Sequence, residues 1–136
     1  MRYLADTTFI IDLVNEDEGA TNLAYELDEV GETVGLSVIS AEEYLRGVYY
    51  LYWGSKKLKQ KIAEAINDLN AFEILPITCE IARKAAELEI VMMKRGKPLA
   101  LADILIASTA LVHKLILITR NIKHFQEVPG LKIRIY

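Results

Sequence analysis

The sequence predicts an α/β fold in which a mainly parallel sheet is covered by helices on both faces. Short apolar runs that suit buried strands alternate along the chain with longer segments whose apolar residues recur at helical spacing. The chain has 136 residues, 52% of them hydrophobic, which is enough to bury a sizeable core in one domain spanning residues 1–136. The strand candidates are residues 3–5, 33–39, 73–77, 115–119 and 132–136.

The first half of the chain contains four expected helices. Residues 7–14 are apolar on nearly every side, and residues 20–30 carry apolar residues at helical spacing. A third helix begins at Ser40 and ends before Gly54, and residues 56–71 form a fourth with an apolar stripe. We expect the third and fourth helices to pack as a hairpin.

The second half of the chain contains two expected helices. Thr78 is placed to cap a helix that runs to about Lys94. Residues 99–113 form the most apolar helix of the chain. A Pro129-Gly130 turn then precedes the last strand.

Composition argues against a secreted or membrane-spanning protein. Cys79 is the only cysteine, so no internal disulfide can form, and no Cys/His cluster has the spacing of zinc ligands. The N-terminus lacks the features of a signal peptide. The apolar residues 99–118 are interrupted by Asp103, His113 and Lys114, which indicates a buried helix and strand. We expect a soluble protein of the reducing cytoplasm.

The net charge of −3 conceals an uneven distribution. Residues 1–45 contain eleven acidic residues and one basic residue, whereas residues 46–136 contain fifteen basic and eight acidic residues. An acidic pocket beside a basic surface would suit a metal-dependent enzyme that acts on a polyanion. Ordinary solvated helix faces explain the same distribution equally well.

Asp6 lies where the first strand ends and the first helix begins. In an open parallel sheet, ligands bind at the carboxyl ends of the strands. The alternative is that Asp6 only caps the helix, because its side chain can accept the free amides of the first turn. Asp12 lies on another face of this helix and is expected to be solvated.

Glu43 follows the second strand and is expected in the first turn of the next helix. Ser40 and Glu43 also match the Ser-x-x-Glu capping box, which requires no catalytic role. Gly47 lies one turn along the same face, where a missing side chain would let a ligand approach.

Asp103 is the only charged residue between Lys97 and Lys114. Because its surroundings are apolar, its charge must face a cleft, a partner or a cation. The alternative is an ordinary exposed acid near a helix N-terminus, where the helix dipole favours negative charge.

Polar residues also follow the strand at residues 115–119. Asn121 offers an amide oxygen, Thr119 a hydroxyl that could hold a water molecule, and Arg120 a cation that could meet a phosphate. All are also common turn residues. His124, beside Phe125, is expected to serve packing or to lie on the surface.

Three carboxylates brought together would repel one another unless they are protonated or bind a hard cation, for which Mg²⁺ or Mn²⁺ is the natural choice. Such a site suits phosphodiester hydrolysis, because the cation lowers the pKa of a water molecule and neutralises charge on the leaving oxygen. No serine or cysteine nucleophile is required.

At these residues the sequence resembles the PIN-domain ribonucleases, specifically the VapC-type toxins of prokaryotic toxin–antitoxin pairs. The resemblance covers essentially the whole chain. Asp6 in LADTTFIIDL, Glu43 in ISAEEYLRG and Asp103 in LADILIASTA match the three acidic positions of the family. Asn121 in LITRNIKHF occupies a fourth position that is often acidic, with Thr119 at the usual hydroxyl position.

The resemblance implies a five-stranded α/β/α sandwich, Mg²⁺- or Mn²⁺-dependent endoribonuclease activity on RNA, a homodimer, and a VapB-like antitoxin that covers the site. The implied catalytic residues are Asp6, Glu43, Asp103 and Asn121, and the first three would hold the metal. The residues expected to orient the carboxylates or the substrate are Thr7, Arg46, Thr119 and Arg120. Because Asn121 removes one negative charge, we expect one well-held ion.

An aromatic and basic cluster lies in the expected helical hairpin. It could stack on single-stranded RNA. The alternative is a protein interface. We favour the interface because Tyr and Trp are enriched at buried contacts between proteins. Its members are Tyr44, Tyr49, Tyr50, Trp53, Lys56 and Lys57.

Three other classes of protein remain as alternatives. A phosphatase of the haloacid-dehalogenase type would require a second Asp two residues after Asp6, where Thr8 stands. In a receiver-like signalling domain the acidic residues follow strands, but Glu43 and Asp103 fall in expected helices. A catalytically silent PIN-like module that binds RNA or protein is favoured only by Asn121.

Overall fold

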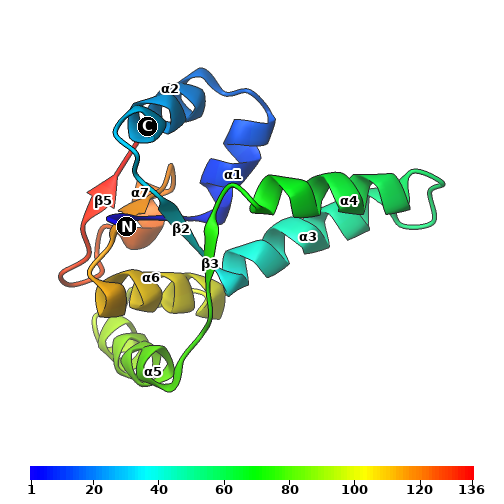
Figure 1. Cartoon of the computed structure of the whole chain (residues 1–136). Helices are drawn as coiled ribbons and strands as arrows, with labels where there is room; N and C mark the ends of the chain where they lie inside the picture. The colour runs from blue at the N-terminus through cyan, green and yellow to red at the C-terminus, as the bar shows by residue number, and fades with distance from the viewer.

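A computed structural model describes all 136 residues and contains a five-stranded sheet in which every strand pair is parallel (Figure 1). The strand order is β3-β2-β1-β4-β5. This confirms the expected α/β fold with a parallel sheet. The strands are β1 (Tyr3–Ala5), β2 (Val34–Ser37), β3 (Glu73–Leu75), β4 (Ile116–Ile118) and β5 (Ile133–Arg134).

The two faces of the sheet bury separate apolar clusters. In β1, Tyr3 and Ala5 join one cluster and Leu4 joins the other, because successive side chains of a strand point to opposite faces. In β4, Ile118 and Leu117 divide in the same way. The central strands are therefore apolar on both faces, which explains why their sequences are continuous apolar runs.

Helices cover both faces of the sheet, as Figure 1 shows. Helices α1 and α2 pack on the first cluster, and α5 and α6 on the second. None of the helices combines the length and the hydropathy needed to cross a membrane. The helices are α1 (Thr7–Val14), α2 (Glu18–Glu29), α3 (Val38–Tyr52), α4 (Leu58–Leu69), α5 (Cys79–Lys94), α6 (Leu101–His113) and α7 (Ile122–Phe125). Helix α7 was not predicted, because four residues are too few to show helical periodicity.

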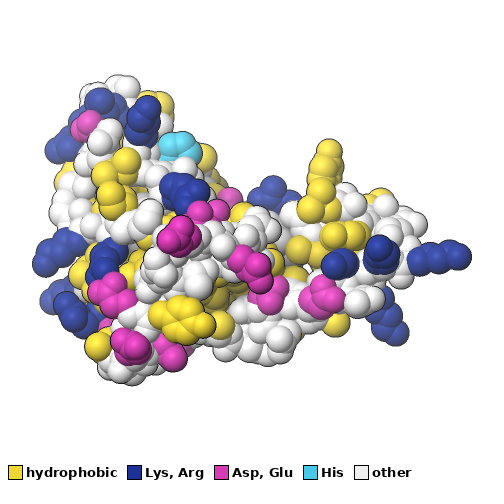
Figure 2. All heavy atoms as spheres, turned by 90° about the horizontal axis from the view of Figure 1, so that it is seen from above, with side chains coloured by type: hydrophobic (Ala, Val, Ile, Leu, Met, Phe, Trp, Pro, Cys, Tyr) yellow, Lys and Arg dark blue, Asp and Glu magenta, His cyan; other side chains and the backbone are white.

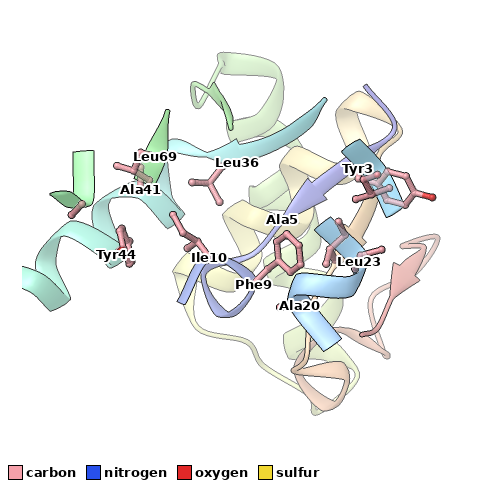
Figure 3. Packing of buried hydrophobic residues seen from close by; sticks show 13 residues of the cluster. Tyr3, Ala5, Phe9, Ile10, Ala20, Leu23, Leu36, Ala41, Tyr44 and Leu69 are labelled. Atoms are coloured by element: carbon pink, nitrogen blue, oxygen red, sulfur yellow. The ribbon is translucent and has the colours of Figure 1, made fainter. Parts of the chain in front are cut away.

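Helices α3 and α4 form the expected hairpin, which extends beyond the sheet (Figure 1). Figure 3 shows Ala41, Tyr44 and Leu69 packed near Ile10 of α1 at the base of this hairpin. The Tyr44 hydroxyl donates a hydrogen bond to Asp68 Oδ2 at 2.8 Å, which ties α3 to α4. The base of the hairpin thus belongs to the core, whereas its outer end is free of the sheet.

Helix α3 begins two residues earlier than the sequence predicts. Ser37 is its N-cap and accepts a hydrogen bond from the Ile39 amide at 3.1 Å, so the capping box of Ser40 and Glu43 is wrong. Strand β2 ends at Ser37, and the β-branched residues Val38 and Ile39, which suggested a longer strand, form the first helical turn. Ser40 is buried without a hydrogen-bond partner, and Glu43 falls in the second turn.

The connectivity creates a switch point at the centre of the sheet. From β1 the chain builds β2 and β3 on one side, then crosses over to build β4 and β5 on the other. In open α/β sheets, ligands bind outside the carboxyl ends of the strands at such a point. Asp6 follows β1 and Thr119 follows β4 there, and the Asp6 amide donates to the Ile118 carbonyl at 3.0 Å.

The start of α3 can be tested with two serine substitutions three residues apart. Ser37→Ala should lower the free energy of unfolding by about 1 kcal/mol, because it removes the N-cap. Ser40→Ala should leave it unchanged or raise it, because it removes a buried hydroxyl that has no partner. Urea denaturation of both variants gives the comparison. A larger loss in Ser40→Ala than in Ser37→Ala would restore the capping box.

Candidate active site

Asp6 lies at the switch point and is only 4% exposed. The Thr8 hydroxyl donates to Asp6 Oδ1 at 2.5 Å, and the Thr119 hydroxyl donates to Asp6 Oδ2 at 2.5 Å. The Phe9 amide also donates to Asp6 Oδ1, at 3.2 Å, so Asp6 does cap α1 as the alternative interpretation proposed. Capping occupies one oxygen, whereas the bond from Thr119 joins Asp6 to a loop 113 residues away.

Burial raises the pKa of the Asp6 carboxyl above its usual value of 3.8. The hydrogen bonds from Thr119, Thr8 and the Phe9 amide act in the opposite direction, because they stabilise the charged form. Desolvation is the larger effect. The site therefore holds a carboxylate whose negative charge is incompletely compensated.

Glu43 is connected to Asp6 through the neighbouring threonine. The Thr7 hydroxyl donates to Glu43 Oε1 at 2.6 Å, which brings α3 against the start of α1. Thr7 therefore contacts a carboxylate that it was proposed to orient. A Cβ atom built on Gly47 would meet nothing within 4 Å, so the face beyond Glu43 is open. Glu43 and Gly47 line a groove of about 350 Å³ between α1, α3 and α4.

Asp103 lies on α6, which packs on the opposite face of the sheet from α1. It lies in the first turn of α6, half-buried, and its Oδ2 is 3.4 Å from His124 Nδ1. Burial raises the pKa of Asp103, and the charge and hydrogen bond of His124 partly offset this effect. His124 is exposed, as expected, but no pattern in the sequence predicts its contact with Asp103.

Asn121 takes part through its backbone. Its amide donates to Thr119 Oγ1 at 2.9 Å, which fixes the hydroxyl that serves Asp6. The Asn121 side chain is exposed and does not cap α7. The Thr119 hydroxyl thus accepts a hydrogen bond from the Asn121 amide and donates one to Asp6.

The residues fit a hard divalent cation by their chemistry, since Asp6, Glu43 and Asp103 supply carboxylate oxygens and Asn121 an amide oxygen. Their side chains do not converge, however: no group of three or more His, Cys, Asp or Glu residues is close enough to hold a metal ion. Each carboxylate instead has a partner of its own, a threonine hydroxyl or His124. Cation binding therefore requires these side chains to turn toward one another.

Two arginines expected to orient the site make other contacts. Arg46 pairs with Glu42 at 2.8 Å on the exposed face of α3. Arg120 lies 3.3 Å from Asp12 and 2.8 Å from Asp17. The prediction that Asp12 is solvated is wrong, because it is half-buried and also accepts a hydrogen bond from a distant tyrosine.

The aromatic and basic cluster of the hairpin is largely exposed. Figure 2 shows Lys and Arg side chains toward the end of the hairpin with an acidic side chain beside them, and both acidic and basic side chains over the body of the molecule. Tyr44 is the exception: it is buried and bonded to Asp68, and it lines the groove beside Glu43. The exposed members are Tyr49, Tyr50, Trp53, Lys56 and Lys57.

Asp6 and Asp17 both cap helices, and we expect the ionised side chain to lower folding stability at Asp6 and to raise it at Asp17. Because burial raises the folded-state pKa of Asp6, its ionisation costs stability once the pH exceeds the usual value of 3.8. Asp6→Asn keeps a good capping residue and removes this charge. We therefore expect Asp6→Asn to be more stable than the wild type at pH 7, with the difference shrinking as the pH falls toward 3.8.

Asp17 provides the control, because it also caps a helix, α2, through the Ala20 amide. That amide, followed by Arg120, lowers the pKa of Asp17, so its charge stabilises the fold above pH 3.8. Asp17→Asn should be less stable than the wild type at pH 7, and the loss should vanish as Asp17 becomes protonated at low pH. Thermal unfolding between pH 3 and pH 7 measures both. If both substitutions raised stability at pH 7, or both lowered it, the opposite pKa shifts of Asp6 and Asp17 would be contradicted.

Comparison with known proteins places the chain in a family. A family model for the PIN domain matches residues 3–131. The chain is 29% identical to Ribonuclease VapC1 of Methanocaldococcus jannaschii, over 99% of this chain and 87% of that protein. It is 32% identical to Toxin FitB of Neisseria gonorrhoeae, over 90% of this chain and 89% of that protein.

The fold comparison agrees. The crystal structure of VapBC2 from Rickettsia felis, bound to a DNA fragment from its promoter, contains a similar chain with a TM-score of 0.86 and 26% identity. The alignment covers 100% of this chain and 99% of that chain. Since the family match spans nearly the whole sequence, the chain belongs to the PIN-domain family, and its relatives include VapC ribonucleases.

Proposed function

We propose that this protein is a metal-dependent endoribonuclease and the toxin of a VapBC-type toxin–antitoxin pair. The observation that carries the proposal is the position of Asp6, a buried carboxylate held by two threonine hydroxyls at the switch point of the sheet. Relatives in the family are named as a ribonuclease and as a toxin, which supports the reaction and the biological role.

Asp6, Glu43 and Asp103 would hold a Mg²⁺ or Mn²⁺ ion. Bound there, the ion would lower the pKa of a water molecule and neutralise charge developing on the leaving oxygen of the RNA. The raised pKa values of Asp6 and Asp103 support this role, because both carboxylates are desolvated without a full positive partner. Two positive charges would offset that cost.

The threonines orient the carboxylates. Thr119 and Thr8 each bind one oxygen of Asp6, and Thr7 binds Glu43, so hydroxyl donors hold two of the proposed ligands in this structure. Such outer contacts commonly change metal affinity or activity by about 10- to 100-fold when they are removed. Asn121 supports Thr119 and adds no charge, so three carboxylates favour one tightly held ion.

The groove beside Glu43 is a candidate binding site for the antitoxin. Its walls include Ile11 and Val14 from α1 and Val48 and Leu51 from α3, which would take apolar side chains of a peptide. The Rickettsia felis neighbour is a VapBC structure, which supports a VapB-like partner here. The exposed residues Tyr50 and Trp53 at the outer end of α3 extend the surface available to an antitoxin or to a second copy of the chain.

A second candidate is a PIN-like module that binds RNA or protein without cleaving it. The specific observation in its favour is that no three acidic or histidine side chains converge on one point. Asn121, which replaces an acid often found at this position, favours it as well. The two candidates differ in whether RNA is cut when a divalent cation is present.

RNA cleavage assays of the wild type and of carboxylate-to-amide variants distinguish the ribonuclease from the silent module. The purified protein should cleave single-stranded RNA with Mg²⁺ or Mn²⁺, and a chelator should abolish cleavage. Glu43→Gln and Asp103→Asn should each lower the cleavage rate by about 100-fold or more. Each variant lacks a carboxylate that would hold the cation, and the cation would stabilise the charge of the transition state by several kcal/mol.

Glu42→Gln is the control, because Glu42 precedes Glu43 but is exposed and paired with Arg46. Its rate should equal that of the wild type. Cleavage that persists undiminished in Glu43→Gln and Asp103→Asn would refute the proposed site. No cleavage by the wild type with either metal would favour the silent module.

A further inference from the structure

Arg120 is held by three side chains from distant parts of the chain, and we call this group the Arg120 clamp. Arg120 Nε lies 3.3 Å from Asp12 Oδ2, and one terminal nitrogen lies 2.8 Å from Asp17 Oδ2. The guanidinium carbon lies 5.2 Å from the centre of the Tyr136 ring. The Tyr136 hydroxyl donates to Asp12 Oδ2 at 2.6 Å, which closes the group.

The Arg120 clamp contacts one of the two hydroxyls that bind Asp6, that of Thr8, and the other belongs to Thr119, the residue before Arg120. Arg120 directly follows Thr119, whose side chain donates to Asp6, and the Arg120 amide donates to Thr8 Oγ1 at 3.4 Å. The Tyr136 hydroxyl lies 3.5 Å from the same Thr8 oxygen. Thr8 in turn donates to Asp6. Movement of the clamp would therefore displace the partners of the candidate catalytic carboxylate.

The charges of the clamp oppose contact between Arg120 and a phosphate. The side chain is 49% exposed, its Nε and one terminal nitrogen face carboxylates, and one face of the guanidinium stacks on Tyr136. Two carboxylates surround one guanidinium, so the group carries a net negative charge. A phosphate that approached the remaining N–H groups of Arg120 would meet this like charge.

We propose that Arg120 is a positioning residue. It fixes the loop of Thr119 and Asn121 against Asp6 by means of Asp12, Asp17 and Tyr136, and it does not bind the RNA phosphate. The catalytic consequence of this role rests on the proposed ribonuclease function, whereas the effect on the loop does not.

The difference between arginine and lysine separates the two roles. Arg120 spans two carboxylates with different nitrogens of one planar group and stacks on an aromatic ring. Lysine offers a single point charge and cannot do all three. A single phosphate contact would tolerate lysine better than the clamp does, because an ammonium also binds phosphate as a point charge.

Cleavage kinetics provide the first test. We expect Arg120→Lys and Arg120→Gln both to lower kcat by about 10- to 100-fold, the range seen when a supporting residue is removed, with KM within about twofold of the wild type. Tyr136→Phe should also lower kcat, and combining it with Arg120→Gln should cost no more than the larger single effect, because the residues act as one group.

Arg134→Gln is the control, since Arg134 pairs with the exposed Glu26 outside the clamp. Its kcat should match the wild type. The proposal is overturned if Arg120→Lys retains full kcat while Arg120→Gln raises KM and reduces the salt dependence of RNA binding by about one phosphate contact.

Amide hydrogen exchange provides a second test that requires no RNA cleavage. The Asn121 amide donates to Thr119 Oγ1 at 2.9 Å, and the Ile81 amide donates to Thr78 Oγ1 at 3.2 Å at the start of α5. In Arg120→Lys and Tyr136→Phe, exchange at Asn121 should be faster than in the wild type, with exchange at Ile81 unchanged.

The two tests separate the possible failures. A wild-type protein that cleaves no RNA refutes the proposed function, and faster exchange at Asn121 still supports the clamp. Unchanged exchange at Asn121 in both variants overturns the clamp even if RNA is cleaved.

Discussion

The hydrogen bond from Thr119 to Asp6 joins the two loops between which the sheet changes its direction of growth. Strand β1 ends at Ala5 and strand β4 at Ile118, and their pairing brings residues 113 positions apart into contact. The remaining features of the site depend on this contact. Thr7, the residue after Asp6, donates to Glu43, and the loop after Thr119 leads into α7, whose His124 contacts Asp103. The parallel sheet thus arranges groups that no local sequence segment could assemble.

Holding a carboxylate here opposes stability. Burial raises the pKa of Asp6 although three donors stabilise its charge, so ionised Asp6 makes folding less favourable at neutral pH. Asp103 shows the same effect of burial with a weaker partner, the half-exposed His124. Functional sites commonly retain such unfavourable groups because the chemistry needs them. A bound divalent cation would offset the free-energy cost of burying these charges, which the threonine hydroxyls only reduce.

Patterns within short sequence segments correctly predicted the features that depend only on neighbouring residues. The boundary between strand and helix located Asp6, and an isolated charge in an apolar helix located Asp103. Predictions failed where a distant partner decides the outcome. Ser40 matched a capping box, yet the end of β2 at its pairing with β3 made Ser37 the cap. Asp12 was assigned to solvent from helical spacing, and its partner is a tyrosine 124 residues away. No pattern along the sequence could reveal that contact.

We propose that Asp6, Glu43 and Asp103 serve as ligands of one divalent cation. Isothermal titration of Mn²⁺ into the purified protein tests it without reference to RNA. We predict one ion bound per chain by the wild type and by Glu42→Gln, and loss of that binding in Glu43→Gln and Asp103→Asn, because each lacks one anionic ligand. Absence of binding to the wild type, or equal binding by all four proteins, would contradict the account.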